Sequence, residues 1–217
     1  YQISKSLRFN TPDNAWLYRT PTSKGDRRCW TYSTWLKTGN VRSPSYTRRL
    51  LAADGQAAGS TGEGNRFHFN IGVDGKLACG DGAQNWFFST DGIFRDCNAW
   101  YHIVMAVDTK HTVEQERIII WVNGKRVAWN GKGADARSAN AELAGFKADQ
   151  IMQIGVGENQ KADQLLAETY LIDGQQLNPA AFGKFDDKNL WVPRTFTVPT
   201  PNDGTTWSST VTTGGAS

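Results

Sequence analysis

Short stretches in which apolar and polar residues alternate occupy most of the chain. Phe67, Phe69 and Ile71, for example, alternate with His68 and Asn70, and a period of two is the period of a β-strand with one buried face. Similar stretches recur about every ten residues. They predict strands at 6–10, 15–19, 30–38, 46–53, 65–73, 76–79, 86–94, 100–108, 118–122, 126–129, 151–156, 165–172 and 190–192.

Turn dipeptides separate many of these strands. Glycine follows Asp or Asn at Asp54-Gly55, Asp74-Gly75, Asp81-Gly82, Asp91-Gly92, Asn123-Gly124 and Asp173-Gly174. Such pairs reach positive φ at low cost, which two-residue hairpins require. We expect Asn123-Gly124 to form a type I′ turn, and Asn178 to cap a single helical turn at 179–183. Residues 132–150 are Ala-, Gly- and charge-rich and predict a surface loop.

The segment 100–108 is apolar at both of its strand faces. One face would carry Tyr101, Ile103, Met105 and Val107, and the other Trp100, His102, Val104 and Ala106. A strand with two apolar faces is covered on both sides. The sequence therefore predicts an all-β fold, a two-sheet antiparallel β-sandwich. Four tryptophans fall within predicted strands and are expected in the core: Trp30, Trp35, Trp100 and Trp121.

Composition favours one large folded domain. The chain has 217 residues, 39% hydrophobic residues and 9 Trp, 6 Tyr and 10 Phe, enough for a sizeable core. We expect the domain to span 1–198, because residues 199–217 are Thr-, Ser- and Gly-rich and are typical of a linker or tail. No apolar run approaches the length of a membrane span, so we expect no membrane insertion. The three cysteines, Cys29, Cys79 and Cys97, show no metal-ligand spacing and predict packing thiols of a reducing compartment.

Positive charge is concentrated near the start of the chain. Residues 1–50 hold ten Lys and Arg against two Asp and Glu, whereas the net charge of the whole chain is +3. The basic residues include Arg27, Arg28, Arg42, Arg48 and Arg49. They could form a patch for phosphate or an acidic glycan, but solvated strand edges explain them more simply. We expect no nucleic-acid partner.

The order of several motifs resembles a known family. SLRFN at 6–10, WTYSTWLKTG at 30–39, AWYHIVMAVDT at 99–109, ERIIIWVNGKRV at 116–127 and LLAETYLIDGQQLNPAAFGKFDDKNLWVPR at 165–194 are similar to the concanavalin A-like lectin/glucanase superfamily of laminin-G-like type. The closing run at 165–194 is similar to the version in bacteriophage tail fibres, tailspikes and head appendages. The resemblance implies a curved jelly roll whose concave sheet often carries a sugar site, with calcium in some members.

Catalysis is not expected. Glycoside hydrolysis needs two carboxylates across one bond, and Glu168 and Asp173 are separated by an odd spacing that puts them on opposite faces of a strand. His102 is expected to be a core histidine with satisfied ring nitrogens. Asp108 ends a predicted strand and is the calcium candidate, but calcium takes six to eight oxygens. We therefore expect no cofactor and no metal, with calcium as the alternative.

Sugar binding needs an aromatic face together with planar polar groups. Aromatic residues in turn-rich segments are the candidates, with polar neighbours as companions. The predicted glycan-binding residues are Asp81, Asn85, Trp86, Arg95, Trp129 and Asn130.

These expectations favour a non-enzymatic bacteriophage virion module that adheres to a host-surface glycan. It would reside in the virion after assembly in the host cytoplasm, be oligomeric in the particle and contact other virion proteins. The first alternative is a structural module that docks on another virion protein, for which a large exposed apolar patch would be diagnostic. Two others are a diverged glycoside hydrolase and a secreted cellular laminin-G-like domain.

Overall fold

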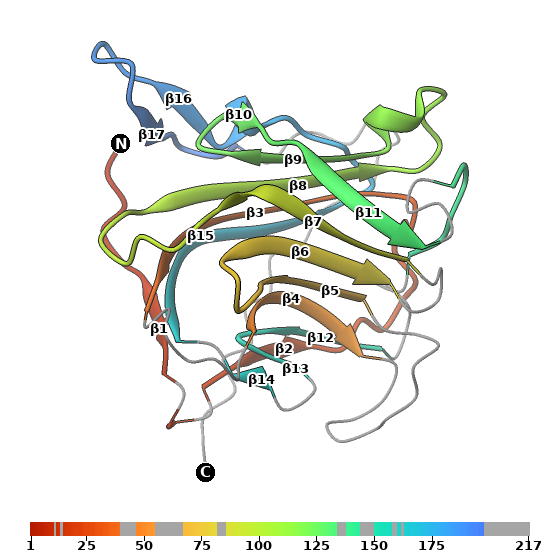
Figure 1. Cartoon of the computed structure of the whole chain (residues 1–217), viewed down its shortest axis with the longest axis horizontal. Helices are drawn as coiled ribbons and strands as arrows, with labels where there is room; N and C mark the ends of the chain where they lie inside the picture. The colour runs from red at the N-terminus through yellow and green to blue at the C-terminus, as the bar shows by residue number, and fades with distance from the viewer. Residues whose placement is uncertain are drawn as a thin grey trace.

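A computed structural model describes residues 1–10, 12–13, 15–39, 47–54, 67–81, 86–133, 138–143, 150–157, 160–161 and 163–197. It is an all-β jelly roll of two stacked antiparallel sheets (Figure 1). One sheet has six strands in the order β1 (Leu7–Phe9), β15 (Gln164–Asp173), β3 (Cys29–Thr38), β8 (Tyr101–Asp108), β9 (Ile118–Val122) and β10 (Lys125–Arg126). The predicted sandwich is confirmed.

The second sheet has seven strands. Their order is β11 (Trp129–Gly133), β7 (Trp86–Ile93), β6 (Lys76–Asp81), β5 (Phe67–Ile71), β4 (Arg48–Asp54), β12 (Ile151–Ile154) and β2 (Leu17–Arg19). Two small ribbons pair β13 (Val156–Gly157) with β14 (Gln160–Lys161), and β16 (Gly183–Phe185) with β17 (Trp191–Pro193). The described helical elements are the 3-10 turns η2 (Glu114–Glu116) and η3 (Pro179–Ala181), and none is long or apolar enough to cross a membrane.

The main core lies between the two sheets. Trp30 of β3 meets Phe67 of β5 edge to face at 5.3 Å, and Tyr32 meets Phe69 in the same geometry at 6.1 Å. Edge-to-face pairs of this kind add to the stabilisation from burying both rings. All four side chains are buried, so the alternating pattern of the sequence correctly identified the inward faces.

The outer face of the six-stranded sheet is covered as well. We call residues 174–197 the closing segment; they include η3 and the β16–β17 ribbon. Phe182 of this segment packs with Val104 of β8 and Ile172 of β15 in a second apolar cluster. The prediction that 100–108 is covered on both faces is confirmed. The side chain of Asn178 accepts a hydrogen bond from the N–H of Ala180, which confirms the predicted cap.

Two local predictions were wrong. The expected strand at 126–129 is split, because Arg126 still pairs with Trp121 whereas Trp129 pairs with Thr90 of the other sheet. The chain crosses from one sheet to the other here, and the ring of Trp129 packs against the ring of Phe88, with centroids 4.1 Å apart. The segment 132–150 is not simply a surface loop, since Leu143 is fully buried in the main core.

The predicted Asn123-Gly124 turn is confirmed, and of the expected packing thiols Cys29 and Cys79 are buried whereas Cys97 is half-buried. Asn123 and Gly124 both have positive φ, 50° and 76°, as a type I′ turn requires. All three cysteines are free. Residues 198–217 lie outside the described residues, so the proposed tail stays a prediction.

Candidate functional site

The structure does not bring the sequence-predicted glycan residues together. Asp81 is buried and pairs across the sheet with Phe67, a core residue. Trp129 packs against the main core. Asn130 is exposed and donates to Asp91 Oδ1 at 2.6 Å. Arg95 is exposed beyond the end of β7. Asn85 and the side chain of Trp86 lie outside the described part of the structure.

A pocket of about 380 Å³ lies elsewhere, on the side of the six-stranded sheet that the closing segment covers. That volume falls in the range of small-ligand pockets. Residues of the N-terminal arm, two tryptophans and two residues of β17 line it: Tyr1, Gln2, Ile3, Ser4, Lys5, Ser6, Trp35, Trp100, Val192 and Pro193. We call it the Trp35–Trp100 pocket. Figure 1 shows the N-terminus beside β17, where these segments meet.

Trp35 lies on β3, and Trp100 immediately precedes the neighbouring strand β8. Trp35 pairs across the sheet with His102, and Trp100 lies two residues before His102, on the same face. Trp35 is 6% exposed, whereas Trp100 is 37% exposed. The indole of Trp35 therefore forms part of the floor of the pocket, and the indole of Trp100 leaves more of its surface accessible.

The N-terminal wall is held at both ends. Leu7 pairs with Leu166 where β1 joins β15. At the other end the hydroxyl of Tyr1 donates to Glu168 Oε1 at 2.5 Å. Glu168 has a positive φ of 47° inside the bulge of β15, and its other carboxylate oxygen accepts from the hydroxyl of Tyr170.

The opposite wall is held by His102. The indole N–H of Trp191, next to Val192, donates to His102 Nδ1 at 3.0 Å, and Ser33 Oγ lies 2.9 Å from His102 Nε2. The imidazole also stacks on Trp35, with ring centroids 4.9 Å apart. Burial lowers the pKa of His102 to about 3. His102 is thus a neutral core histidine, as the sequence predicted.

This geometry argues against a serine nucleophile. Because an indole N–H can only donate, Nδ1 of His102 must be the acceptor. The single proton of the neutral ring then sits on Nε2 and is donated to Ser33. A general base would need Nε2 free to accept the serine proton, so this pair is built to position Trp191 rather than to activate Ser33.

The carboxylates of β15 do not form a hydrolytic pair. Glu168 holds the hydroxyls of Tyr1 and Tyr170, whereas Asp173 accepts from the backbone N–H of Asp26 at 2.7 Å. Five residues of strand separate the two by roughly 15 Å, beyond the spacing at which glycosidases act. Burial is the largest cause of the raised pKa of Asp173.

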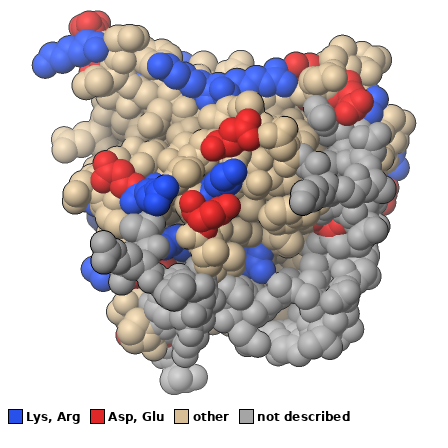
Figure 2. All heavy atoms as spheres, viewed as in Figure 1, with Lys and Arg blue, Asp and Glu red and all other residues tan. Residues whose placement is uncertain are grey.

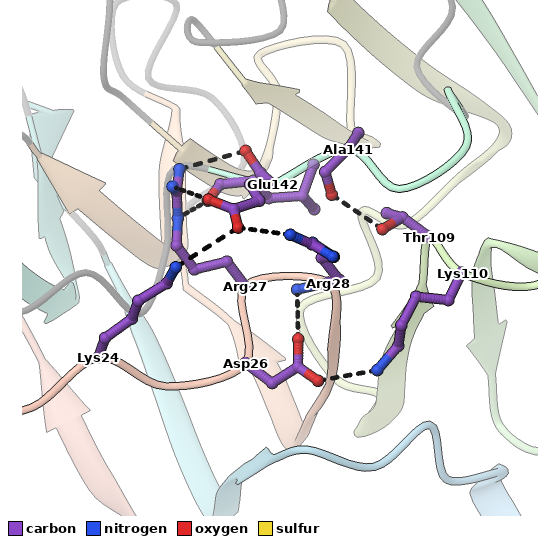
Figure 3. Close-up of polar contacts among 9 residues, drawn as sticks. Lys24, Asp26, Arg27, Arg28, Thr109, Lys110, Ala141 and Glu142 are labelled. Carbon is purple, nitrogen blue, oxygen red and sulfur yellow. Dashed lines mark hydrogen bonds and ion pairs between the residues drawn. The ribbon is translucent and has the colours of Figure 1, made fainter.

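The basic residues at 24–28 are occupied within the molecule (Figure 3). Glu142 accepts from Arg27 Nη1 at 2.8 Å and from Arg28 Nη2 at 2.9 Å, and lies 3.4 Å from Lys24 Nζ. The hydrogen bond from Arg28 is the largest cause of the lowered pKa of Glu142. Lys110 pairs with Asp26 at 2.9 Å.

The other basic residues that the sequence suggested for a phosphate or acidic-glycan patch do not form one with Arg27 and Arg28. Arg48 and Arg49 are buried, and Arg42 lies outside the described residues. Figure 2 shows positive and negative groups interspersed over the face in view. Solvated strand edges, the simpler expectation, do not describe these residues either, because Arg48 and Arg49 are buried and Arg27 and Arg28 pair with Glu142.

Asp108 forms a local turn. Its Oδ1 accepts from the backbone N–H of Lys110 at 3.0 Å. Within the described ranges no three His, Cys, Asp or Glu side chains are grouped to hold a metal ion.

The sequence-based assignment of four tryptophans to the core holds only in part. Trp35 is buried as expected, although it also lines the pocket, whereas Trp100 was expected in the core and is 37% exposed. Trp121 packs beneath the closing segment. Trp30 is in the core as expected. The strand period had already placed Trp100 and His102 on the second face of 100–108, and this was the available signal. The N-terminal wall has no comparable sequence signature.

A sequence model described as the concanavalin A-like lectin/glucanases superfamily, of laminin G type, matches residues 14–165. The chain belongs to this superfamily. Comparison with curated proteins found no match.

Solved structures share the fold at low identity. Domains LG4-5 of the mouse laminin alpha1 chain align with a TM-score of 0.50 and 10% identity over 91% of this chain and 46% of that one. The CBM40 of Ruminococcus gnavus IT-sialidase, bound to alpha2,3 sialyllactose, gives 0.49 and 13% over 82% and 95%. Trypanosoma rangeli sialidase gives 0.49 and 13% over 80% and 25%. This chain thus spans less than half of the laminin and Trypanosoma chains.

Proposed function

We propose that this member of the concanavalin A-like superfamily is a carbohydrate-binding module whose ligand occupies the Trp35–Trp100 pocket. The observation that carries the proposal is that two tryptophans and the polar residues Gln2, Ser4 and Ser6 line one pocket. The apolar C–H face of a sugar ring packs on an indole, and its hydroxyls need such polar groups.

The proposed binding is non-enzymatic. Hydrolysis would require a carboxylate pair or an activated nucleophile. Glu168 and Asp173 have separate partners, and the proton on His102 Nε2 faces Ser33. The module would bind its glycan and release it unchanged.

We also propose that binding requires no metal. Asp108 is engaged by the backbone of Lys110, and among the described residues no Asp or Glu lines the pocket. Glycan affinity is therefore expected to be equal in calcium and in EDTA. A loss of affinity in EDTA that calcium restores would contradict this part of the proposal.

The setting we propose is a bacteriophage particle. The run 165–194, similar to that of tail fibre and head appendage proteins, supports it, and this run forms β15 and the closing segment. The module would then act on a host-surface glycan, as one copy among several in an oligomeric virion component. Detection of the chain in purified virions by mass spectrometry would test this setting.

A glycan array that includes bacterial surface polysaccharides tests the proposed function. We expect Trp100→Ala to abolish binding that the wild type shows, because it removes the exposed ring of the pocket. Phe87→Ala is the matched control, since Phe87 is an exposed aromatic residue on the other sheet, 47% accessible. Loss with Phe87→Ala and retention with Trp100→Ala would move the site to the seven-stranded sheet. A blank array from folded protein would favour the docking alternative.

A further inference from the structure

The charge around the Trp35–Trp100 pocket is one-sided. Of the lining residues within the described part of the chain, Lys5 is the charged one, and none carries a carboxylate. A pocket for a neutral sugar has no need of a cation, and placing one there without a counter-charge favours an anion.

The strand register adds two more cations on the same face. Arg8 of β1 pairs with Leu165 of β15, which pairs with Lys37 of β3. Residues directly opposite one another share a sheet face. Leu36 pairs with Tyr101, and both lie on the inner face, toward the main core. Lys37 follows Leu36 and Trp100 precedes Tyr101, so both side chains lie on the outer face of the six-stranded sheet. We call Lys5, Arg8 and Lys37 the cationic rim.

The cationic rim differs from the other basic cluster of the molecule. Lys24, Arg27 and Arg28 converge on Glu142. Among the described residues, by contrast, no ion pair joins a carboxylate to Lys5, Arg8 or Lys37. Their charge is available to a ligand.

One carboxylate, that of Glu168, contacts a residue of the pocket wall. Glu168 lies at the Tyr1 end, with its oxygens occupied by the hydroxyls of Tyr1 and Tyr170. Lys5 and Ser6 lie at the other end, next to β1. The pocket is therefore polarised along the N-terminal arm, and an acidic group fits the end nearest β1.

We propose that the pocket selects an acidic saccharide, with a sugar ring on Trp100 and its carboxylate toward Lys5, Arg8 and Lys37. This inference rests on the proposed function and gives it a ligand class. Exposed ion pairs contribute modestly, so each rim residue should alter affinity by about two- to fivefold, and added salt should weaken binding.

The test compares acidic probes with their neutral forms. Oligogalacturonate and 3′-sialyllactose are each titrated by calorimetry against their carboxyl-reduced counterparts. We expect at least one acid to bind about tenfold more tightly than its reduced form. Lys5→Gln, Arg8→Gln and Lys37→Gln should each weaken the acid and leave the reduced form unchanged. Lys125→Gln, at an exposed lysine of β10, is the matched control and should have no effect.

The possible outcomes separate the two proposals. Equal affinity for acid and reduced forms, with both lost on Trp100→Ala, would overturn the acidic ligand and keep the carbohydrate site. Binding of neutral array glycans but of neither acid would also overturn the acidic ligand and keep the carbohydrate site. Acid binding that survives Trp100→Ala would place the anion outside the pocket and overturn the inference. Absence of binding to any glycan would overturn both proposals.

Discussion

At the scale of single residues, His102 controls how one wall of the pocket is held. It is neutral because burial lowers its pKa to about 3, and neutrality leaves Nδ1 free to accept from Trp191. In the unfolded chain an imidazole titrates near 6.5. As the pH falls below 6.5 the unfolded state takes up a proton that the folded state does not, so stability decreases toward acid pH.

We predict that between pH 7 and pH 4.5 this residue removes roughly 2–3 kcal/mol of unfolding free energy. Urea unfolding at both values measures the loss. In His102→Gln, which can still donate and accept, the decrease should be smaller by that amount. Carboxylates such as Asp26 titrate in both proteins, so the difference isolates the histidine. Equal decreases in the two proteins would show that His102 is protonated within the fold.

At the scale of elements, the closing segment depends on close packing beneath Trp191. A Cβ added at Gly124 would overlap the Trp191 ring, and Gly124 has a φ of +76°. Gly174 has nearly the same φ, +75°, but a Cβ there would meet nothing within 4 Å. The two glycines thus separate backbone strain from packing.

We predict that Gly174→Ala costs about 1–2 kcal/mol through its left-handed backbone alone, and that Gly124→Ala costs about 1–3 kcal/mol more through overpacking. Gly124→Ala should also weaken glycan binding, because Val192 and Pro193 follow Trp191 in the pocket wall. Thermal unfolding and calorimetry measure the two effects. Equal destabilisation by both substitutions would mean that the ring of Trp191 moves aside freely.

A second pair of variants tests the contact between residues 24–28 and 138–143. The Arg27 side chain is only 10% exposed and donates to Leu143 O at 2.6 Å as well as to Glu142. The Arg28 side chain is 42% exposed. We predict that Arg27→Ala destabilises by about 1–3 kcal/mol, because it leaves buried acceptors without a donor, and Arg28→Ala by about 0–1 kcal/mol. Comparable urea midpoints for the two variants would contradict this ranking.

The strand period predicted most of these elements, and it failed where tertiary contacts decide. Ile118–Val122 has the expected bounds, because five β-forming residues stop at an Asn-Gly turn. The break after Arg126 was not predictable, because the strand pattern of 126–129 is compatible with pairing to either sheet. The contact between the rings of Phe88 and Trp129 favours the seven-stranded sheet, and this contact is not visible in the sequence. Leu143 was missed because one leucine in a polar segment has no periodicity.

At the scale of the whole molecule, the pocket lies on the sheet face that the closing segment covers. The closing segment packs on the outer face of the six-stranded sheet, and its strand β17 lies beside the N-terminus (Figure 1). The pocket lies where these two segments meet. The sequence predicted the sandwich but placed the sugar site near the ends of β6, β7 and β11. A pocket that joins the N-terminal arm, Trp35, Trp100 and β17 is not visible in a local pattern, because its parts are far apart in the sequence.

The docking alternative also belongs to this scale. In the described part of the chain, the exposed large apolar side chains are distributed over both sheets and the turns: Tyr1, Leu7, Tyr18, Val73, Phe87, Ile93, Trp100, Val113, Phe185 and Leu190. Only Tyr1 and Trp100 of these line the pocket. This distribution suits a ligand pocket with a few aromatic residues better than one broad contact surface.

The position of the ligand is the most direct test of the account. We would titrate the ¹⁵N-labelled protein with the tightest ligand from the glycan array and follow the indole N–H signals. The account predicts shifts for Trp35 and Trp100, with Trp30, enclosed between the sheets, unchanged. Shifts confined instead to the backbone signals of Phe87 and Asn130 would place the sugar on the seven-stranded sheet and contradict the proposed site.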